Sequence, residues 1–278
     1  MFATEKLIKM ALEEDLGSGD VTTLSTVPPG TLASALIKAK QECVVAGIQV
    51  LGRVFRTLDP ALKIEARVAD GDRLKVGDSI MAVSGNVISI LMAERVALNF
   101  VQRLCGVATL TSRFVAAVEG FQAEIVDTRK TTPGWRSLEK YAVQIGGARN
   151  HRHGLFDGIL IKDNHIRAAG TITDAITHAQ RLAPHGLKIE VEAADLDEVK
   201  EAARSGADII LFDNMEEALL QEAVTFVRDR FPAIKLEASG GIVLDNVAQV
   251  AACGVDFISV GALTHSAPAI DISLDLVS

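Results

Sequence analysis

Long apolar runs and paired cysteines are both missing from this sequence. No stretch approaches the length of a membrane span, and the first twenty residues lack the order of charged, apolar and small residues that marks a signal peptide. The three cysteines, Cys43, Cys105 and Cys253, lie far apart, which argues against a disulfide framework, a metal-binding pair or a redox dithiol. We therefore expect a cytoplasmic protein whose cysteines stay reduced.

Positive charge is also scarce, because 28 Lys and Arg residues stand against 36 Asp and Glu residues and leave a net charge of −8. A nucleic-acid-binding protein needs a broad basic surface for phosphate contacts, so this balance argues against that class. What is abundant is Val, Ile, Leu and Ala, which suit parallel strands packed against helices. A chain of 278 residues can form one large α/β domain or two unequal domains.

The first part of the chain changes its pattern twice. An amphipathic helix is predicted over residues 4–14, before a Gly-rich turn at 17–20. Short runs typical of strands then follow at residues 35–38, 44–46, 64–68 and 79–84. Two helices are predicted next, over 90–104 and 107–119, and Arg95 lies on the polar face of the first.

From residue 122 onward, strand-length and helix-length segments alternate. The apolar runs are 124–126, 158–161, 188–191, 208–212, 235–238 and 256–260. Helical patterns lie between them, near 137–146, 171–182, 195–205, 216–230 and 244–253. Such alternation predicts right-handed strand–helix–strand units around a parallel sheet or barrel, and therefore an α/β fold.

Polar residues follow each of these apolar runs. The residues at these strand ends are 127–130, 162–165, Glu190 and Glu192, 213–214, Glu237 and Ser239, and Ser259 to Gly261. In a (β/α) barrel the C-terminal ends of the strands meet at one mouth, where active sites lie. Ordinary structural ends would carry generic turn residues, so this pattern favours a functional mouth.

Positive charge is concentrated between residues 129 and 167, where eight Lys or Arg residues stand against three Asp or Glu residues. A solvated helix face is the simplest alternative, but these charges interrupt apolar runs and lie beside Gly-rich breaks. A clamp for carboxylates and phosphates fits better, because Arg offers forked donors and Lys a point charge.

Two Gly-containing loops and two carboxylates complete the predicted mouth. Ser239-Gly240-Gly241 and Gly261-Ala262 each follow a strand, where backbone N–H groups can approach a phosphate, although glycine also serves plain turns. Glu192 and Asp213 suit Mg²⁺ or ribose hydroxyls, with simple charge balance as the alternative.

The triplet His151-Arg152-His153 allows a metal site in principle, since alternate residues of a strand share a face. However, it follows a Gly-Gly break, and Arg152 would place positive charge beside a cation. Anion contact by His151 and Arg152 is therefore preferred.

Several ordered motifs resemble quinolinate phosphoribosyltransferase, also called nicotinate-nucleotide pyrophosphorylase (carboxylating). They are GDVTT (19–23), ERVALN (94–99), DTRKTTPG (127–134), LEKYAV (138–143), GGARNHR (146–152), LIKDNH (160–165), EVE (190–192), FDNM (212–215), EASGG (237–241) and SVGALTH (259–265). The resemblance implies an N-terminal α/β sandwich domain over residues 1–106 and an incomplete (β/α) barrel over 107–267. It also implies that residues 268–278 return to the first domain.

The resemblance also assigns roles to residues of this chain. It implies phosphoribosyl transfer from 5-phosphoribosyl pyrophosphate to quinolinate, with loss of CO₂, for de novo NAD biosynthesis. Catalytic roles fall on Lys130, Lys162, Glu192 and Asp213, with Mg²⁺ at Glu192 and Asp213, directly or through water. Substrate contacts fall on Arg95, Thr128, Arg129, Lys130, His151, Arg152, Lys162, Glu192, Asp213, Ser239, Gly240, Gly241, Gly261 and Ala262. The expected assembly is a homodimer or a hexamer of dimers in which Arg95 reaches the neighbouring subunit's site.

Three alternatives remain at this point. A paralogue associated with molybdenum transport shares the Asp-Thr-Arg-Lys-Thr segment but departs from the Lys-Asp-Asn-His pattern found at residues 162–165. A metal-dependent hydrolase would use His151 and His153. A non-catalytic regulator would bind 5-phosphoribosyl pyrophosphate without releasing pyrophosphate.

Overall fold

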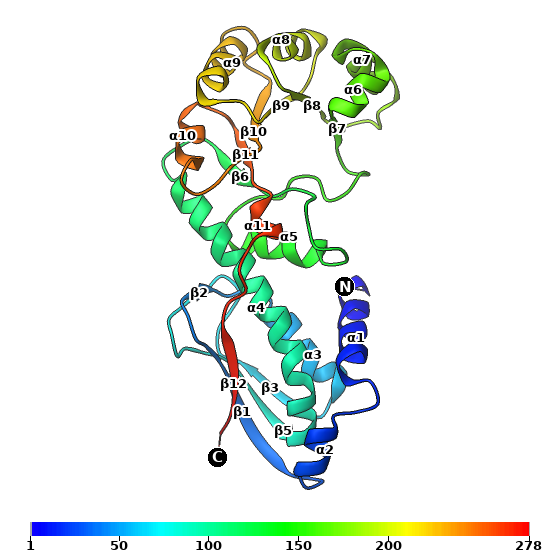
Figure 1. Ribbon diagram of the computed structural model, residues 1–278, viewed down its shortest axis with the longest axis vertical. Helices are drawn as coiled ribbons and strands as arrows, with labels where there is room; N and C mark the ends of the chain where they lie inside the picture. The colour runs from blue at the N-terminus through cyan, green and yellow to red at the C-terminus, as the bar shows by residue number, and fades with distance from the viewer. Residues whose placement is uncertain (1, 278) are drawn as a thin grey trace. The chain divides into compact units, whose positions relative to one another are not determined.

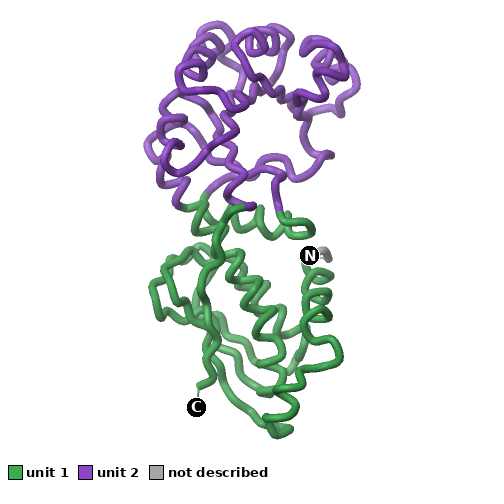
Figure 2. Tube along the Cα trace, viewed as in Figure 1, with its two compact units in different colours: residues 1–112, 132–147, 266–278 green, residues 113–131, 148–265 purple. Residues whose placement is uncertain are grey.

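The computed structural model describes residues 2–277, and the chain forms two compact units (Figure 2). Unit 1 contains residues 1–112, 132–147 and 266–278, and unit 2 contains residues 113–131 and 148–265. Residues 132–147 thus group with unit 1 by their contacts, whereas the family resemblance implied that they belong to the second domain. No helix within the described residues combines the length and the apolar character that a membrane crossing requires.

Unit 1 is built on a four-stranded antiparallel sheet in the order β12-β1-β5-β3 (Figure 1). Its strands are β1 (Leu32–Ala39), β3 (Lys63–Ala66), β5 (Ser79–Asn86) and β12 (Ile272–Val277). A two-stranded sheet joins β2 (Cys43–Val44) to β4 (Arg73–Leu74). The helices are α1 (Phe2–Leu16), α2 (Val21–Thr26), α3 (Ile48–Leu58), α5 (Arg136–Ile145) and the first part of α4 (Val87–Ala117).

Helix α3 corrects the prediction of only β-like segments in this region. Its buried residues Ile48, Leu51, Val54 and Phe55 recur at helical spacing, so the signal was present but was obscured by the flanking strand-like runs. The helix begins after Gly47, whose φ of 96° is in the left-handed region. The Ile48 N–H donates to Asp70 Oδ1 at 3.0 Å, which satisfies one of the unpaired donors of the first turn.

Helix α4 corrects a second prediction, because residues 87–117 form one helix where the sequence suggested two. Gly106 lies in the gap between the two predicted helices. Within the helix, a Cβ at Gly106 would lie 2.0 Å from the backbone oxygen of Pro268. Glycine is therefore required there by a close backbone approach from a distant part of the chain, which local sequence does not show.

Unit 2 contains a six-stranded parallel sheet in the order β6-β11-β10-β9-β8-β7. The strands are β6 (Glu124–Val126), β7 (Ile159–Ile161), β8 (Ile189–Ala193), β9 (Ile209–Asp213), β10 (Lys235–Ser239) and β11 (Phe257–Ser259). All six coincide with the apolar runs in the sequence, which confirms the predicted α/β class. The two edge strands, β6 and β7, are not paired with each other, so the barrel is incomplete.

Helices cover the outside of this curved sheet, as Figure 1 shows. They are α6 (Asp163–Ala169), α7 (Ile172–Leu182), α8 (Leu196–Ser205), α9 (Glu217–Arg230) and α10 (Val247–Ala252), with α11 (Ala262–His265) after the last strand. Asp195 caps α8 by accepting the N–H groups of Asp197 and Glu198, and Glu198 accepts the N–H of Ala194. Gly206 ends α8 with a φ of 86°.

Candidate active site

A cavity of about 470 Å³ lies in unit 2 at the C-terminal ends of the barrel strands. We call it the mouth cavity. Its lining combines cationic, hydroxyl, carboxylate and glycine residues from five of the strands and the loops that follow them. These are Asp127, Thr128, Arg129, Lys130, His151, Arg152, Leu160, Lys162, Leu211, Asp213, Asn214, Glu237, Ser239, Gly240, Gly241 and Ser259. The polar residues that follow separate strands in the sequence therefore surround one space.

Four cationic side chains border the mouth cavity, and two of them come directly after β6. Thr128 Oγ1 accepts the N–H of Lys130 at 3.0 Å, and the Lys130 carbonyl accepts from Thr264 Oγ1 at 2.8 Å. These bonds fix the backbone that carries Arg129 and Lys130. A Cβ at Gly261 would lie 3.2 Å from Lys130 Cδ, so the loop after β11 approaches this lysine closely.

Arg152 is the third cationic residue, and it lies on the turn that follows residue 150. Its Nη1 donates to the Gly158 carbonyl at 3.1 Å. Burial lowers the pKa of the Arg152 guanidinium and the neighbouring charge of Arg129 lowers it further, while Glu190 and Asp157 oppose the shift. Two guanidinium groups held this close favour an anionic ligand, since each raises the free energy of the other in its absence.

Lys162 is the fourth cationic residue, at the junction between β7 and α6. Its Nζ lies 2.5 Å from Glu192 Oε2, which comes from β8. The backbone N–H of Lys162 donates to His165 Nδ1 at 2.9 Å, so the side chain of His165 caps the start of α6. The ion pair holds Lys162 at the cavity while its ammonium group remains about half exposed.

Asp213 pairs with Ser239 at the ends of β9 and β10, and Asn214 and Gly240 follow them in the two adjacent loops. Asn214 has a φ of 53°, an unusual conformation for a residue with a side chain, and its amide donates to Asp213 Oδ1 at 3.0 Å. A Cβ at Gly240 would lie 2.2 Å from Asn214 Oδ1. The close approach of these two loops therefore requires glycine at 240.

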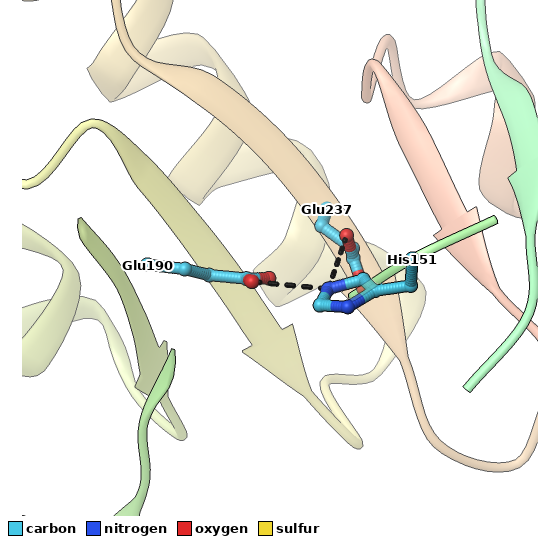
Figure 3. Close-up of side chains that lie close together, drawn as sticks. All are labelled: His151, Glu190 and Glu237. Atoms are coloured by element: carbon cyan, nitrogen blue, oxygen red, sulfur yellow. Dashed lines mark ion pairs between the residues drawn. The ribbon is translucent and has the colours of Figure 1, made fainter. Parts of the chain in front are cut away.

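A buried cluster of His151, Glu190 and Glu237 lies below these residues (Figure 3). Glu190 comes from β8 and Glu237 from β10, and both carboxyl groups point toward the imidazole ring. His151 Nε2 lies 3.0 Å from Glu190 Oε2 and 3.6 Å from Glu237 Oε2. Glu190 is 4% exposed and Glu237 is 2% exposed.

Two further contacts set the orientation of His151. Asp127 Oδ1 accepts its backbone N–H at 2.8 Å, and its Nδ1 accepts the N–H of Arg152 at 2.7 Å. The ring nitrogens therefore face the chain and the two carboxyl groups. His151 also lines the mouth cavity, and its contact with an anion stays a prediction.

Glu190 and Glu237 are the site residues that sequence reasoning missed. They were noted as polar ends of strands, yet they lie inside the barrel and are among its most buried carboxyl groups. The signal was their spacing of two residues from Glu192 and Ser239. Residues i and i+2 of a strand share a face, so all four side chains point into the barrel.

Burial raises the pKa of Glu237 to about 8. The nearby Glu190 carboxyl adds to the rise, while His151 and the Ser259 hydroxyl oppose it. A carboxylic acid that keeps its proton near neutral pH is a candidate for proton transfer.

Most of the predicted site residues meet at the mouth cavity, with four exceptions. Glu192 is outside the lining but contacts Lys162, and Gly261 is beside Lys130. Ala262 begins α11 and is also outside the lining. Arg95 is exposed on α4 in unit 1.

Two groups of side chains in unit 2 could hold a metal ion. Glu192 and Asp213 offer carboxylate oxygens beside the mouth cavity, which fits Mg²⁺ held by one or two carboxylates together with substrate phosphates. The His151–His153 pair expected for a hydrolase is not brought together as a ligand set. Among the described residues, the group around His151 that could hold a metal contains Glu190 and Glu237, and the ring of His153 lies near Phe156.

Comparisons with known proteins agree along the whole chain. Residues 20–105 match the model of the quinolinate phosphoribosyl transferase N-terminal domain, and residues 107–275 match that of the C-terminal domain. The chain is 43% identical to the nicotinate-nucleotide pyrophosphorylase (carboxylating) of Mycobacterium leprae, covering 99% of this chain and 97% of that protein. It is 42% identical to a probable enzyme of the same name from Bacillus subtilis, covering 98% of this chain and 93% of that protein.

A solved structure shows the same architecture. The nicotinate-nucleotide pyrophosphorylase from Francisella tularensis aligns with a TM-score of 0.94 and 38% identity, covering 99% of this chain and 96% of that one. Both domain models, the full-length relatives and the cationic mouth of the barrel lead to one conclusion: this chain belongs to the quinolinate phosphoribosyltransferase family.

Proposed function

We propose that this protein transfers the phosphoribosyl group of 5-phosphoribosyl pyrophosphate to the ring nitrogen of quinolinate and releases CO₂. The products are nicotinate mononucleotide, pyrophosphate and CO₂, in the de novo synthesis of NAD. The observation that carries the proposal is the convergence of Arg129, Lys130, Arg152 and Lys162 on one cavity of an acidic protein. Both substrates are polyanions, and their identity is inferred from the family to which the chain belongs.

Different residues of the mouth cavity suit different parts of the two substrates. Arg129 and Arg152 offer planar donor pairs that suit the two carboxylates of quinolinate. Gly240 and Gly241 follow β10 and suit the 5-phosphate, because backbone N–H groups can approach it without a side chain between. Holding both substrates in this way converts a two-molecule reaction into one between oriented neighbours.

Positive charge develops on the ribose as pyrophosphate leaves. Carboxylates beside the cavity, Glu192 and Asp213, stabilise this charge, and Lys130 and Lys162 stabilise the departing oxygens. Mg²⁺ held at Glu192 and Asp213 would supply further neutralisation of the pyrophosphate. The ion pair between Lys162 and Glu192 keeps both groups oriented before substrate arrives.

Loss of CO₂ follows from the product of the first step. The ribosylated ring nitrogen is a pyridinium, and its positive charge stabilises the electron pair that the departing carboxylate leaves on the neighbouring ring carbon. No further cofactor is required for this step in the proposal.

The proposal includes a second subunit and a cellular location. Arg95 is an exposed cation on α4, and in the proposed homodimer, or hexamer of dimers, it contributes to the neighbouring subunit's site. The three cysteines are buried free thiols, which fits the reducing cytoplasm.

The test uses the purified protein with quinolinate, 5-phosphoribosyl pyrophosphate and Mg²⁺. Nicotinate mononucleotide, pyrophosphate and CO₂ are expected in equal amounts. Replacement of quinolinate by nicotinate tests whether the second carboxylate is needed, and little product is expected. Binding of 5-phosphoribosyl pyrophosphate without pyrophosphate release in the complete mixture would contradict the proposal and favour a regulator.

A further inference from the structure

Glu237 lines two cavities of unit 2. Besides the mouth cavity, a cavity of about 340 Å³ reaches the beginnings of the barrel strands, with Ile159, Lys188, Ile209 and Phe257 in its lining. We call it the lower cavity. His151, Arg152 and Glu237 line both cavities, whereas Glu190 lines the lower cavity alone.

One proton must be retained in the cluster of His151, Glu190 and Glu237. The ring nitrogen and one oxygen of each carboxyl group lie within 4.8 Å of one another. In both carboxyl groups, Oε1 is buried and has no hydrogen-bond partner among residues 2–277. Two carboxylate charges in such a place would cost several kcal/mol, so one of the groups remains a neutral acid.

Glu237 is better suited than Glu190 to be that acid. Glu190 has the shorter contact to His151 Nε2, at 3.0 Å against 3.6 Å, and it interacts with the charge of Arg152. Glu190 thus has both the closer imidazole nitrogen and a cationic neighbour, whereas Glu237 has the more distant nitrogen. The charged and titratable groups that face Glu237 are Glu190 from β8 and His151 from the turn after residue 150, with the Ser259 hydroxyl from β11.

The geometry favours a proton site over a metal site. Nδ1 of His151 accepts the Arg152 N–H, so the proton of the neutral ring is on Nε2, directed at Glu190. A metal ion would require a lone pair on that same nitrogen. The cluster therefore stores a proton more readily than it binds a cation.

The proposed reaction requires a proton at one defined moment. When the carbon–carbon bond to the carboxylate breaks, CO₂ leaves and the electron pair stays on the ring carbon beside the pyridinium nitrogen. That pair must become a C–H bond before CO₂ can add back. A general acid at this position contributes about 10²–10⁴-fold to such a step.

We propose, on the basis of the function proposed above, that Glu237 is the acid that protonates this ring carbon. Its O–H bond breaks, the proton joins the electron pair on carbon, and Glu237 becomes a carboxylate. Water in the lower cavity then returns a proton to Glu237. Glu190 and His151 are positioning residues that hold the acid at the wall of the mouth cavity.

Lysines of the mouth cavity are poorer donors for this step. Lys162 is bonded to Glu192, and Lys130 borders the cavity where the phosphates and carboxylates are expected. An ammonium group that gave up its proton would also lose the charge that binds its anion. Glu237 is neutral before the step begins, so it binds no anion through its charge. It can therefore give up its proton without the loss of a substrate contact.

The experiment separates the two chemical steps in a single turnover. Excess wild-type or variant enzyme is mixed with quinolinate, 5-phosphoribosyl pyrophosphate and Mg²⁺, and samples are quenched with acid. Pyrophosphate, CO₂ and the mononucleotides with one or two carboxylates are measured by mass spectrometry and coupled assay. The variants are Glu237→Gln, Glu237→Asp and Asp256→Asn. Asp256 is a buried carboxylate of the same barrel, paired with Arg228 and Lys235 and outside both cavities.

We expect Glu237→Gln to release pyrophosphate at close to the wild-type rate and to accumulate the mononucleotide with two carboxylates. Its formation of nicotinate mononucleotide should slow by about 100-fold, Glu237→Asp should recover part of the loss, and Asp256→Asn should show no accumulation. Equal rates of pyrophosphate and nicotinate mononucleotide formation in Glu237→Gln, whether normal or slow, would overturn the proposal. Failure of the wild-type enzyme to form nicotinate mononucleotide would instead overturn the proposed function.

Wild-type enzyme provides a second test if Glu237→Gln does not fold. The acid form of Glu237 is lost as the pH rises through about 8, so product formation after the first step should slow across that range. Pyrophosphate release should not slow in parallel, and the dicarboxylate mononucleotide should then appear in the quenched samples. A decarboxylation step that is unchanged across this pH range would overturn the proposal.

Discussion

Lys162 and Glu192 form an ion pair with their charged atoms 2.5 Å apart, across the neighbouring strands β7 and β8. Glu192 is mostly buried in this pair, whereas the lysine is about half exposed to the mouth cavity. The pair therefore presents a cation to a ligand while its carboxylate remains ordered beneath it. Removal of either member changes both the charge and the geometry of the mouth.

Lys162→Ala should weaken catalysis through the loss of a charge-assisted contact to substrate. We expect kcat/KM to fall by an amount equivalent to about 1.5–3 kcal/mol, measured with quinolinate and with 5-phosphoribosyl pyrophosphate varied in turn. Lys200→Ala is the matched control, because Lys200 also pairs with a carboxylate but lies on the outer helix α8. Near-normal kinetics in Lys162→Ala would remove Lys162 from the anion clamp.

Gly240→Ala and Gly241→Ala should differ although both glycines have positive φ. At 241 nothing lies within 4 Å of an added Cβ, so the cost is the left-handed backbone alone, about 1–2 kcal/mol. At 240 the Cβ would also collide with Asn214, which lies beside Asp213. Gly240→Ala should therefore raise the KM for 5-phosphoribosyl pyrophosphate more and lower the midpoint of thermal unfolding more. Equal effects would show that the contact with Asn214 is unimportant.

A mixture of Arg95→Ala and Lys162→Ala subunits should recover activity if Arg95 acts on the neighbouring site. Each homodimer lacks one essential cation at both sites. In a mixed dimer one site has both cations, so random mixing should restore about one quarter of the wild-type activity. The subunits are denatured together and refolded, and mixed dimers are identified by tags of different mass. No recovery in isolated mixed dimers would place Arg95 outside the neighbour's site.

The free energy of unfolding should depend on pH through Glu237. Its pKa is about 8 in the folded protein, above the ordinary value of 4.5. Between these values the folded state holds a proton that the unfolded chain has lost, so stability falls as the pH rises and levels off above about 8. Urea unfolding across this range should show a flatter dependence for Glu237→Gln than for the wild type.

Asp256→Asn is a control for this measurement, because the pKa of Asp256 is lowered by folding whereas that of Glu237 is raised. Burial opposes the shift, but hydrogen bonds from Lys235 and Arg228 lower the pKa of Asp256 below its usual value. Its contribution to stability is present above the unfolded pKa and is lost as the pH falls through the folded pKa. The variant should therefore differ from the wild type most at neutral pH and least in strong acid.

The barrel was predictable from the sequence, whereas the chemistry inside it was only partly so. Apolar runs and the polar residues after them indicated each parallel strand and most of the mouth. Glu190 and Glu237 were missed because a carboxylate near a strand end is ordinarily assigned to solvent, although their spacing of two residues from Glu192 and Ser239 places all four on one face of the sheet. The continuity of helix α4 was missed for a related reason. Glycine is required at position 106 by the close approach of Pro268, which lies far along the chain.

Strand β12 pairs with β1 through residues 272–277, at the edge of the unit 1 sheet. During synthesis, β1 leaves the ribosome more than 230 residues before its partner does. The barrel strands are therefore all available for folding while one side of β1 still lacks its neighbour. A nascent chain would carry an open strand edge through this interval, which is the period in which a chaperone or a second nascent chain can pair with it.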